Sequence, residues 1–386
     1  MRKIAAHYVF TGTELLKNAV VEISDTGVIS NIDCFGENIS ETASTEFYSG
    51  IIIPGFVNTH CHIELSHMKN IIPQHLGMAE FCERIKSKRN TASEAEQIAA
   101  IKQADSVMEK EGIVAVGDIS NSAVSIQAKK HSKLFYHTFI ETLGLENNHE
   151  QIFRHNKSLQ KYFIDNNLRA TITPHAPYSL SEMLFEMSVE DGNQSNIISI
   201  HNKESADEIE LFKTKGGRMK QLLGNSLDTI TNTYNNPSHR ILKYAHSSAT
   251  LLMVHNTYTT QSDLTESNQY NITWVLCPNS NLHIENKLPD VELLYKHTSN
   301  IAIGTDSLSS NTSLSILDEL KTLSNKFPCI QLHDLLRWAT FNGAHALHID
   351  EKYGSIKLGA QPGLLLLSGV DFKTMRLNPQ CKIRVL

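Results

Sequence analysis

Residues 55–67 read GFVNTHCHIELSH, a short apolar run that stops at two histidines. Seven further runs follow it, and most of them end at a polar or ligand-type residue. Most lack the alternation of a half-exposed strand, as expected for parallel strands that are buried on both faces. The eight runs are Gly55 to His60, Ile113 to Asp118, Leu134 to Glu141, Leu168 to His175, Ile197 to His201, Leu251 to His255, Thr273 to Cys277 and Ile301 to Asp306.

Longer segments between or after these runs carry apolar residues at helical spacing. Strand–helix alternation repeated eight times is the pattern of a (β/α)₈ or TIM barrel, so we predict this α/β fold for residues 54–353. The stretch from Gly216 to Ser248, rich in Asn, Ser and Thr, is expected to form a loop–helix insertion over the barrel mouth. The helical segments include Glu94 to Glu111, His149 to Asn166, Ser181 to Glu190, Leu314 to Asn325 and Leu332 to Leu347.

Both ends of the chain have a different pattern, with short strand-like segments between Gly and Asp turns. The simplest assembly joins residues 1–53 and 354–386 into one small, β-sandwich-like domain beside the barrel. The segments are Ile4 to Phe10, Ala19 to Ile23, Val28 to Ile32, Leu364 to Leu367 and Ile383 to Leu386.

The composition is ordinary for a globular enzyme, with 40% hydrophobic and 20% charged residues and a formal net charge of -6. No basic groove for nucleic acid is predicted, because the one small basic stretch is expected on a solvated helix face. No segment approaches the roughly 18 apolar residues of a membrane span. The cysteines form no CxxC pair and no signal peptide is recognised, so a cytoplasmic protein is expected. The basic stretch consists of Arg84, Lys86, Lys88 and Arg89.

The ends of the runs carry residues that bind metals. His60 and His62 are two residues apart, so in a strand they project to the same side and can share an ion. An Asp buried after the apolar run IAIGT is costly unless it is paired or bound to a metal. Because barrel active sites lie at the carboxyl ends of the strands, these groups are expected to converge. The other run ends of this kind are His175, His201, His255 and Asp306.

With these motifs in this order, the chain resembles the amidohydrolase superfamily, in particular its cytosine deaminase and chlorohydrolase-like branch. The resemblance covers essentially the whole chain. Each motif alone is of modest specificity, whereas together they are highly specific. They are PGFVNTHCHIE at 54–64, PHAPYS at 174–179, HNKES at 201–205, VHN at 254–256, CPNSNLHIENKLPD at 277–290 and GTDSLSSN at 304–311.

The resemblance implies one divalent cation, zinc in the first place and iron as the alternative, held by His60, His62, His201 and Asp306. It also implies that Glu204 shuttles a proton and that His255 positions the attacking hydroxide or the substrate. A cation lowers the pKa of bound water toward neutrality. Asp306 can then take up the released proton, and Glu204 can protonate a ring nitrogen or the leaving amine. The fourth run lacks the lysine that bridges two ions in related enzymes, which favours a single ion.

Further residues are candidates for contact with the substrate. Two departures from the family pattern limit the transfer of function: ELSHMKN lacks the Arg-Gly step frequent in related deaminases, and GAQPGLLLL lacks the usual acidic residue. Asn279, Ser280 and Asn281 are expected to shape the backbone at least as much as to touch a ligand. The substrate-contact candidates are Glu64, Glu141 and His175, with His67 beside the same pocket or behind it.

The leading hypothesis is hydrolytic deamination of a small amino-substituted heterocycle or nucleoside. One alternative is hydrolysis of a cyclic amide or halide on a related ring, since the same nucleophile serves all of these reactions. A catalytically silent, ligand-binding relative is the alternative of a different class. The expected partner is a small molecule, with neither nucleic acid nor membrane. Related enzymes are often homo-oligomers, and no feature of the sequence fixes a dimer or a tetramer.

Overall fold

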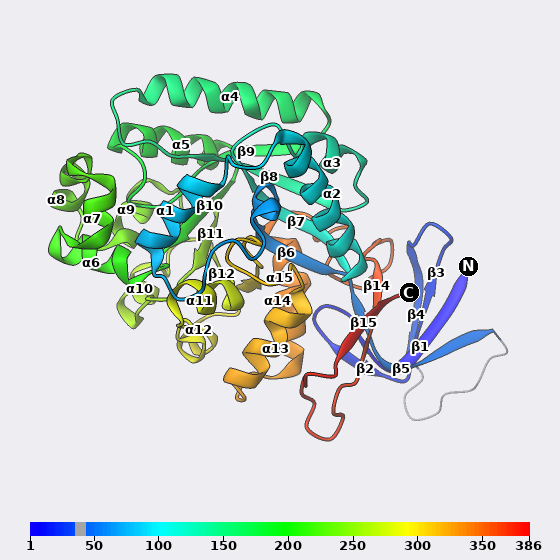
Figure 1. Ribbon diagram of the computed structural model, residues 1–386. Helices are drawn as coiled ribbons and strands as arrows, with labels where there is room; N and C mark the ends of the chain where they lie inside the picture. The colour runs from blue at the N-terminus through cyan, green and yellow to red at the C-terminus, as the bar shows by residue number, and fades with distance from the viewer. Residues whose placement is uncertain (35–43) are drawn as a thin grey trace.

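The computed structural model describes residues 1–34 and 44–386, and its centre is a barrel of eight parallel strands (Figure 1). Each strand coincides with one of the eight predicted apolar runs, which confirms the predicted fold. The strands are β6 (Phe56–Cys61), β7 (Ile113–Ser120), β8 (Phe135–Thr142), β9 (Arg169–Pro174), β10 (Ile197–Asn202), β11 (Thr250–His255), β12 (Ile272–Leu276) and β13 (Ile301–Ile303).

The barrel consists of two parallel four-stranded halves, β6 to β9 and β10 to β13, that meet at two seams. At one seam the His201 amide donates to the His175 carbonyl at 3.0 Å. At the other, the amides of Thr305 and Asp306 donate to the His60 carbonyl at 3.0 and 3.1 Å. The Asn58 side chain completes this second seam, because its Nδ2 donates to Thr305 Oγ1 at 2.7 Å while its Oδ1 accepts from the Thr305 amide.

Helices surround the strands, and several begin at side-chain caps that satisfy their free amides. Ser93 and Glu96 form a capping box at the start of α2, and Ser205 caps α6. The helices after the first six strands are α2 (Glu94–Lys110), α3 (Ile126–His131), α4 (His149–Asp165), α5 (Glu182–Gln194), α6 (Ala206–Thr214) and α10 (Gln261–Glu266), with η1 (Ile63–Met68) and α1 (Met78–Lys88) before α2. Those after β12 are α11 (Pro278–Glu285), α12 (Val291–His297), α13 (Ile316–Lys326), α14 (Leu332–Ala339) and α15 (Phe341–Ala346).

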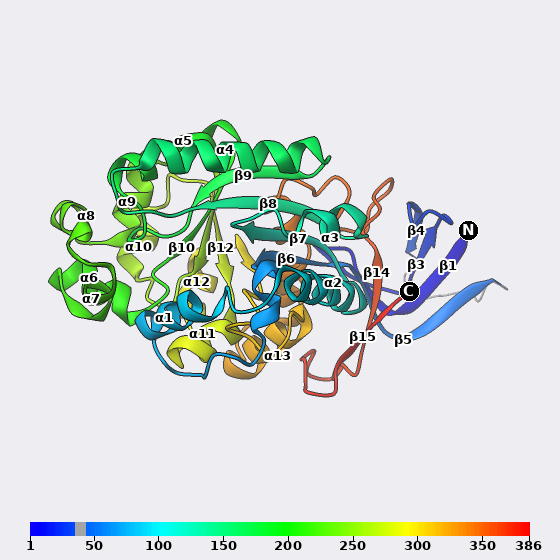
Figure 2. The same cartoon turned by 45° about the horizontal axis from the view of Figure 1, so that its top comes forward.

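The predicted insertion contains four short helices, α7 (Gly217–Leu223), η2 (Asn225–Leu227), α8 (Asp228–Thr233) and α9 (Pro237–Tyr244). Figures 1 and 2 show α6, α7 and α8 together with α1 at the end of the barrel away from the chain termini. The segment from Leu332 to Leu347, expected to be helical, forms two helices, because the chain breaks at Thr340, whose φ is -131° and ψ is -86°. These values lie outside the helical region of backbone space.

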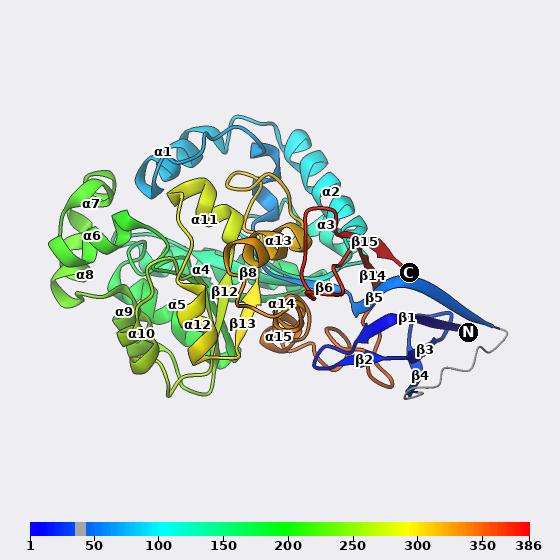
Figure 3. The same ribbon diagram turned by 90° about the horizontal axis from the view of Figure 1, so that it is seen from below.

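Strands from both ends of the chain share one seven-stranded sheet, ordered β15-β14-β5-β1-β3-β4 with β2 on β1. Figure 3 shows this sheet beside the barrel. The boundaries at 53 and 354 stay a prediction, and residues 35–43 of the predicted β domain lie outside the described residues. The strands are β1 (Arg2–Phe10), β2 (Leu15–Lys17), β3 (Ala19–Ile23), β4 (Ile29–Cys34), β5 (Thr45–Pro54), β14 (Leu364–Ser368) and β15 (Lys382–Val385).

Across the described residues, no helix is both long and apolar enough to cross a membrane.

Candidate metal centre and active site

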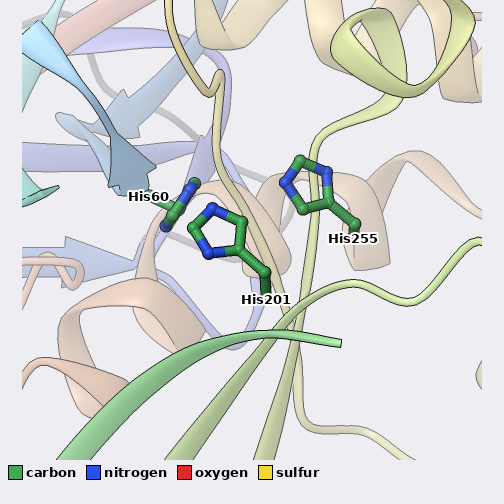
Figure 4. A group of neighbouring side chains, drawn as sticks. All are labelled: His60, His201 and His255. Carbon is green, nitrogen blue, oxygen red and sulfur yellow. The ribbon is translucent and has the colours of Figure 1, made fainter. Parts of the chain in front are cut away.

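Three histidine rings from three strands face one another at the carboxyl ends of the barrel strands. His60 is the last residue but one of β6, while His201 and His255 lie at the ends of β10 and β11, and Figure 4 shows their rings converging. His62, two residues beyond His60, brings its Nε2 to 3.1 Å from Nε2 of His60 and 3.3 Å from Nε2 of His201. The strand alternation predicted from the HxH spacing therefore places both rings in one cluster.

Asp306 joins this cluster from the end of β13. Its Oδ1 lies 3.6 Å from His62 Nε2, while its Oδ2 accepts hydrogen bonds from Ser280 Oγ at 2.6 Å and from Ser310 Oγ at 2.7 Å. The two serines hold one carboxylate oxygen and leave the other facing the histidines. Sequence reasoning missed this role of both serines, although Ser280 was singled out as part of the loop after β12.

The protonation of the rings suits them to bind a cation. Burial and neighbouring histidines hold the pKa of His60 and of His201 well below the ordinary value, so the neutral form is favoured. His201 Nδ1 lies 2.8 Å from the His175 carbonyl, to which it donates, so its Nε2 presents a lone pair. His62 Nε2 can donate at most one proton, so it can bond to only one of the other two ring nitrogens as a donor, whereas a cation among the three could accept a lone pair from each of them.

The donor set fits a small divalent cation. His60, His62 and Asp306 have ligand atoms within 4.8 Å of one another, and so do His62, His201 and Glu141. Imidazole nitrogens with one carboxylate are the ligands of catalytic zinc and of non-haem iron. The buried Nδ1 of His60 has no hydrogen-bond partner among the described residues.

Glu204 and His255 form the second part of the site. Glu204 Oε1 lies 3.3 Å from His255 Nε2, and His255 Nδ1 lies 2.8 Å from Asn281 Oδ1, which fixes the proton on Nδ1. Burial raises the pKa of Glu204 well above its ordinary range, and repulsion from Asp306 and Glu208 raises it further. The protonated form of Glu204 is therefore favoured.

The pKa of Asp306 is shifted in the opposite direction to that of Glu204. Burial works to raise its pKa, but the histidines His62, His255 and His60 together with the Ser280 hydroxyl outweigh burial and lower the pKa to about 2. The pKa values of these two carboxyl groups are thus shifted in opposite directions. The raised pKa suits Glu204 to donate a proton, and the lowered pKa keeps Asp306 ionised. Such a pair is the arrangement that general acid–base catalysis requires.

The backbone at the strand ends is held in a sparsely populated conformation. Asp306 and His255 have φ of 56° and 72°, and Lys203, next but one to His201, has φ of 47°. Residues other than glycine rarely adopt this left-handed backbone conformation, and each residue that does so costs about 1–3 kcal/mol of folding free energy. Strain of this kind clusters at functional sites, where the surrounding structure maintains it.

The predicted substrate-contact residues occupy different positions. Glu141 is buried at the end of β8, with Oε1 unpartnered among the described residues and 4.0 Å from His201 Nδ1. His175 contacts Ser179 Oγ through Nδ1 at 2.9 Å, and its ring centroid is 4.7 Å from that of His201. Both residues border the cluster.

Glu64 and His67 point elsewhere. The Glu64 carboxylate accepts hydrogen bonds from the Asn121 amide, Ser122 Oγ and Ser125 Oγ. The two ring nitrogens of His67 contact the carbonyl oxygens of Glu64 and Arg89 at 3.1 and 2.9 Å. These contacts fix the turn after β6, and substrate contact by Glu64 stays a prediction.

An eight-stranded parallel barrel with histidines and an aspartate gathered at its carboxyl end has its candidate metal site where barrel enzymes place their active sites. Comparison with known families narrows the class: the model of the Amidohydrolase family matches residues 51–385, and the chain belongs to that family.

The sequence identity to individual members of the family is low. The chain is 28% identical over 322 residues to an adenosine deaminase of Helicobacter pylori, covering 79% of this chain and 76% of the relative. It is 27% identical over 357 residues to a 5'-deoxyadenosine deaminase of Methanococcus vannielii, covering 88% and 80%.

Two solved structures share the fold. The aminofutalosine deaminase of Helicobacter pylori in complex with methylthio-coformycin has a TM-score of 0.81 at 23% identity, covering 96% of this chain and 93% of that one. An adenosine deaminase of Xanthomonas campestris with bound zinc has a TM-score of 0.75 at 20% identity, covering 98% and 86%.

Proposed function

We propose that this protein is a metal-dependent aminohydrolase that converts the exocyclic amino group of an adenine-type nucleoside into a carbonyl group, with water consumed and ammonia released. The observation that carries the proposal is the juxtaposition of overlapping groups of metal-binding side chains, among them His60, His62 and Asp306, with the buried carboxyl group of Glu204. The opposite directions in which the pKa values of Glu204 and Asp306 are shifted support it. The names of the two deaminase relatives support the substrate class.

We propose His60, His62, His201 and Asp306 as the residues that hold the ion, zinc in the first place. When bound, such a cation lowers the pKa of a coordinated water toward neutrality and so supplies the nucleophile. The residues of the chain carry out the proton transfers. Asp306, which its low pKa keeps ionised, would accept a proton from the attacking water and pass it to the amino group, which leaves as ammonia. Glu204 in its protonated form would donate its proton to a ring nitrogen as the carbon becomes tetrahedral, and it would recover a proton from the second hydrogen of the water as the carbonyl group forms.

His255 orients these groups. Because Asn281 fixes the proton on Nδ1, the lone pair on Nε2 faces Glu204 and the space between the two carboxyl groups. From this position His255 can accept a hydrogen bond from the attacking water or from Glu204 and hold it in place. Burial of these side chains excludes competing water, which strengthens each of these interactions.

The test combines metal analysis with product analysis. We expect one zinc or iron per chain, and ammonia with the corresponding hypoxanthine product from adenosine, 5'-deoxyadenosine or a close analogue. Metal without ammonia from any amino-heterocycle would favour hydrolysis of another leaving group or a silent binder.

Glu204→Gln tests the proton carrier. We expect this variant to keep its metal and to lose roughly 10²–10⁴-fold in turnover, because general acid catalysis alone is removed. Glu210→Gln is the matched control, since Glu210 is an exposed residue of the same helix region. Loss of metal with Glu204→Gln, or turnover close to the wild-type value, would contradict the assignment.

A further inference from the structure

Glu319 is a fully buried carboxyl group in the first turn of α13, the helix that follows β13. Its hydrogen-bond partners are two amides: Oε2 accepts from the backbone amide of Asn279 at 2.8 Å, and Oε1 accepts from Asn311 Nδ2 at 2.7 Å. Burial raises the pKa of Glu319 to about 8, and the two amide donors work against burial. Because a buried carboxyl group is costly unless its oxygens are hydrogen-bonded, the loss of either contact is unfavourable.

Each donor to this carboxyl group stands next to a serine that holds Asp306. Asn279 precedes Ser280 in the first turn of α11, and Asn311 follows Ser310 in the loop after β13. Both serine hydroxyls donate to Oδ2 of Asp306. One buried side chain therefore bridges the two separate segments of the chain that together hold a proposed metal ligand.

Further contacts attach the same two segments to α13 and to the end of β13. Thr322, one turn further along α13, donates through Oγ1 to Asn279 Oδ1 at 2.7 Å. Asn311 Nδ2 also donates to the carbonyl of Thr305, the residue before Asp306, at 2.9 Å. α13 packs beside α11, as Figures 1 and 3 show. The spacing between the two serine-bearing segments is therefore set by α13, which carries no proposed ligand.

We propose that Glu319 is a positioning residue of the metal centre, which holds Ser280 and Ser310 where both can donate to Asp306. The inference rests on the proposed function, because Asp306 is a proposed ligand. Glu319 belongs neither to the ligand set nor to the proton carriers, and it acts through the two serines. Groups that orient a metal ligand directly change metal affinity by about 10- to 100-fold, so a group one contact further out should act at the lower end of that range.

The experiment is a double-mutant cycle in which zinc affinity is measured by competition with a chromophoric chelator. Glu319→Gln keeps the size of the side chain but replaces one acceptor oxygen with a donor nitrogen, so it can hold only one of the two segments. We expect this substitution alone to weaken zinc binding about 10-fold. In a protein that already carries Ser280→Ala and Ser310→Ala, the same substitution should change zinc affinity by less than about 2-fold, because its effect passes through the missing hydroxyls.

Two further variants make the cycle specific. Asp318→Asn removes a carboxylate from the preceding residue of α13, which is partly exposed and pairs with Lys321 at 3.3 Å, and it should leave zinc affinity unchanged. Asn311→Ala breaks the bridge at its other end and should reproduce both the loss of affinity and the dependence on the serines. This second variant tests the inference even if Glu319→Gln does not fold.

The outcomes separate positioning from general support of the fold. An equal loss of zinc affinity with and without the two serines, or unchanged affinity in both Glu319→Gln and Asn311→Ala, would overturn the inference. A wild-type protein that binds no zinc would overturn the proposed ion site and this inference with it. If the cycle gives the expected result but no nucleoside releases ammonia, the proposed reaction fails and the role of Glu319 stands.

Discussion

The two serines behind Asp306 allow the proposed metal site to be tested without touching a ligand. Ser280 and Ser310 donate to the same Asp306 oxygen at 2.6 and 2.7 Å, and all three side chains are buried. A hydrogen bond to a charged group contributes about 1.5–3 kcal/mol. We therefore expect Ser280→Ala to weaken zinc binding by about 10- to 100-fold, the usual effect of removing a group that orients a metal ligand.

The assay is competition for zinc with a chromophoric chelator, together with the zinc-dependent rise in the free energy of unfolding. Combining Ser280→Ala with Ser310→Ala should weaken binding further, because Asp306 Oδ2 then loses both donors. Ser188→Ala is the control, since this buried serine bonds within α5 at the Leu184 carbonyl. Unchanged zinc affinity in the double variant, measured beside a weakened Asp306→Asn protein, would refute the reasoning.

Three further predictions concern the barrel around the site. Lys129 and Asp118 form an ion pair of 2.6 Å with both side chains fully buried, so Lys129→Met should lower the free energy of unfolding by about 3–5 kcal/mol in denaturant titrations. Adding Asp118→Asn to Lys129→Met should recover part of the lost free energy of unfolding. A double variant that is as unstable as Lys129→Met, or less stable, would contradict this account. Burial, with help from nearby cations, holds the pKa of His137 well below 6.5, so its contribution to stability is complete above that pH and is lost as the pH falls below it. As the pH is lowered from about 6.5 to about 5, the free energy of unfolding of the wild type should therefore fall more steeply than that of His137→Phe, by up to about 1.4 kcal/mol per pH unit. Equal slopes for the two proteins would count against a buried neutral ring. Gly304→Ala would place a Cβ 2.8 Å from the His60 Cβ and carbonyl oxygen, and so should displace the proposed ligand His60. Chelator competition should then show zinc binding weakened about 10-fold or more. Zinc affinity equal to that of the wild type would mean that the two strands can move apart at no cost.

The barrel was predictable because its strands are buried on both faces and leave an uninterrupted apolar signal. β5 was missed for the opposite reason. It begins with the polar residues Thr45 and Glu46, contains Gly50 at a φ of 155°, and only its last five residues are buried. A strand with one exposed half and one buried half shows neither the polar–apolar alternation of a half-exposed strand nor the continuous apolar run of a buried strand along its whole length.

The grouping of the site residues was also predictable, because carboxyl ends of parallel strands meet at one face. The supporting contacts were not. Ser310 and Asn121 are short polar residues in loops, and Ser280 lies in the first turn of α11 although its segment was expected to form a loop. In such segments the sequence alone cannot distinguish a turn former from a hydrogen-bond partner. Arg84, Lys86 and Lys88 of the basic stretch are exposed, whereas Arg89, directly after α1, is half-buried, with its Nη2 3.5 Å from Asn121 Oδ1.

The seam between β6 and β13 has a consequence for the biosynthesis of the protein. Asn58 and Thr305, which close this seam, are 247 positions apart, and His60 and Asp306 lie directly beyond them. A nascent chain that has not yet reached Asp306 lacks both the strand that completes the ring and the carboxylate of the proposed ion site. The ribosome must therefore deliver nearly the entire barrel before the proposed cation can be captured by its full set of ligands, and any earlier metal contact would involve histidines alone.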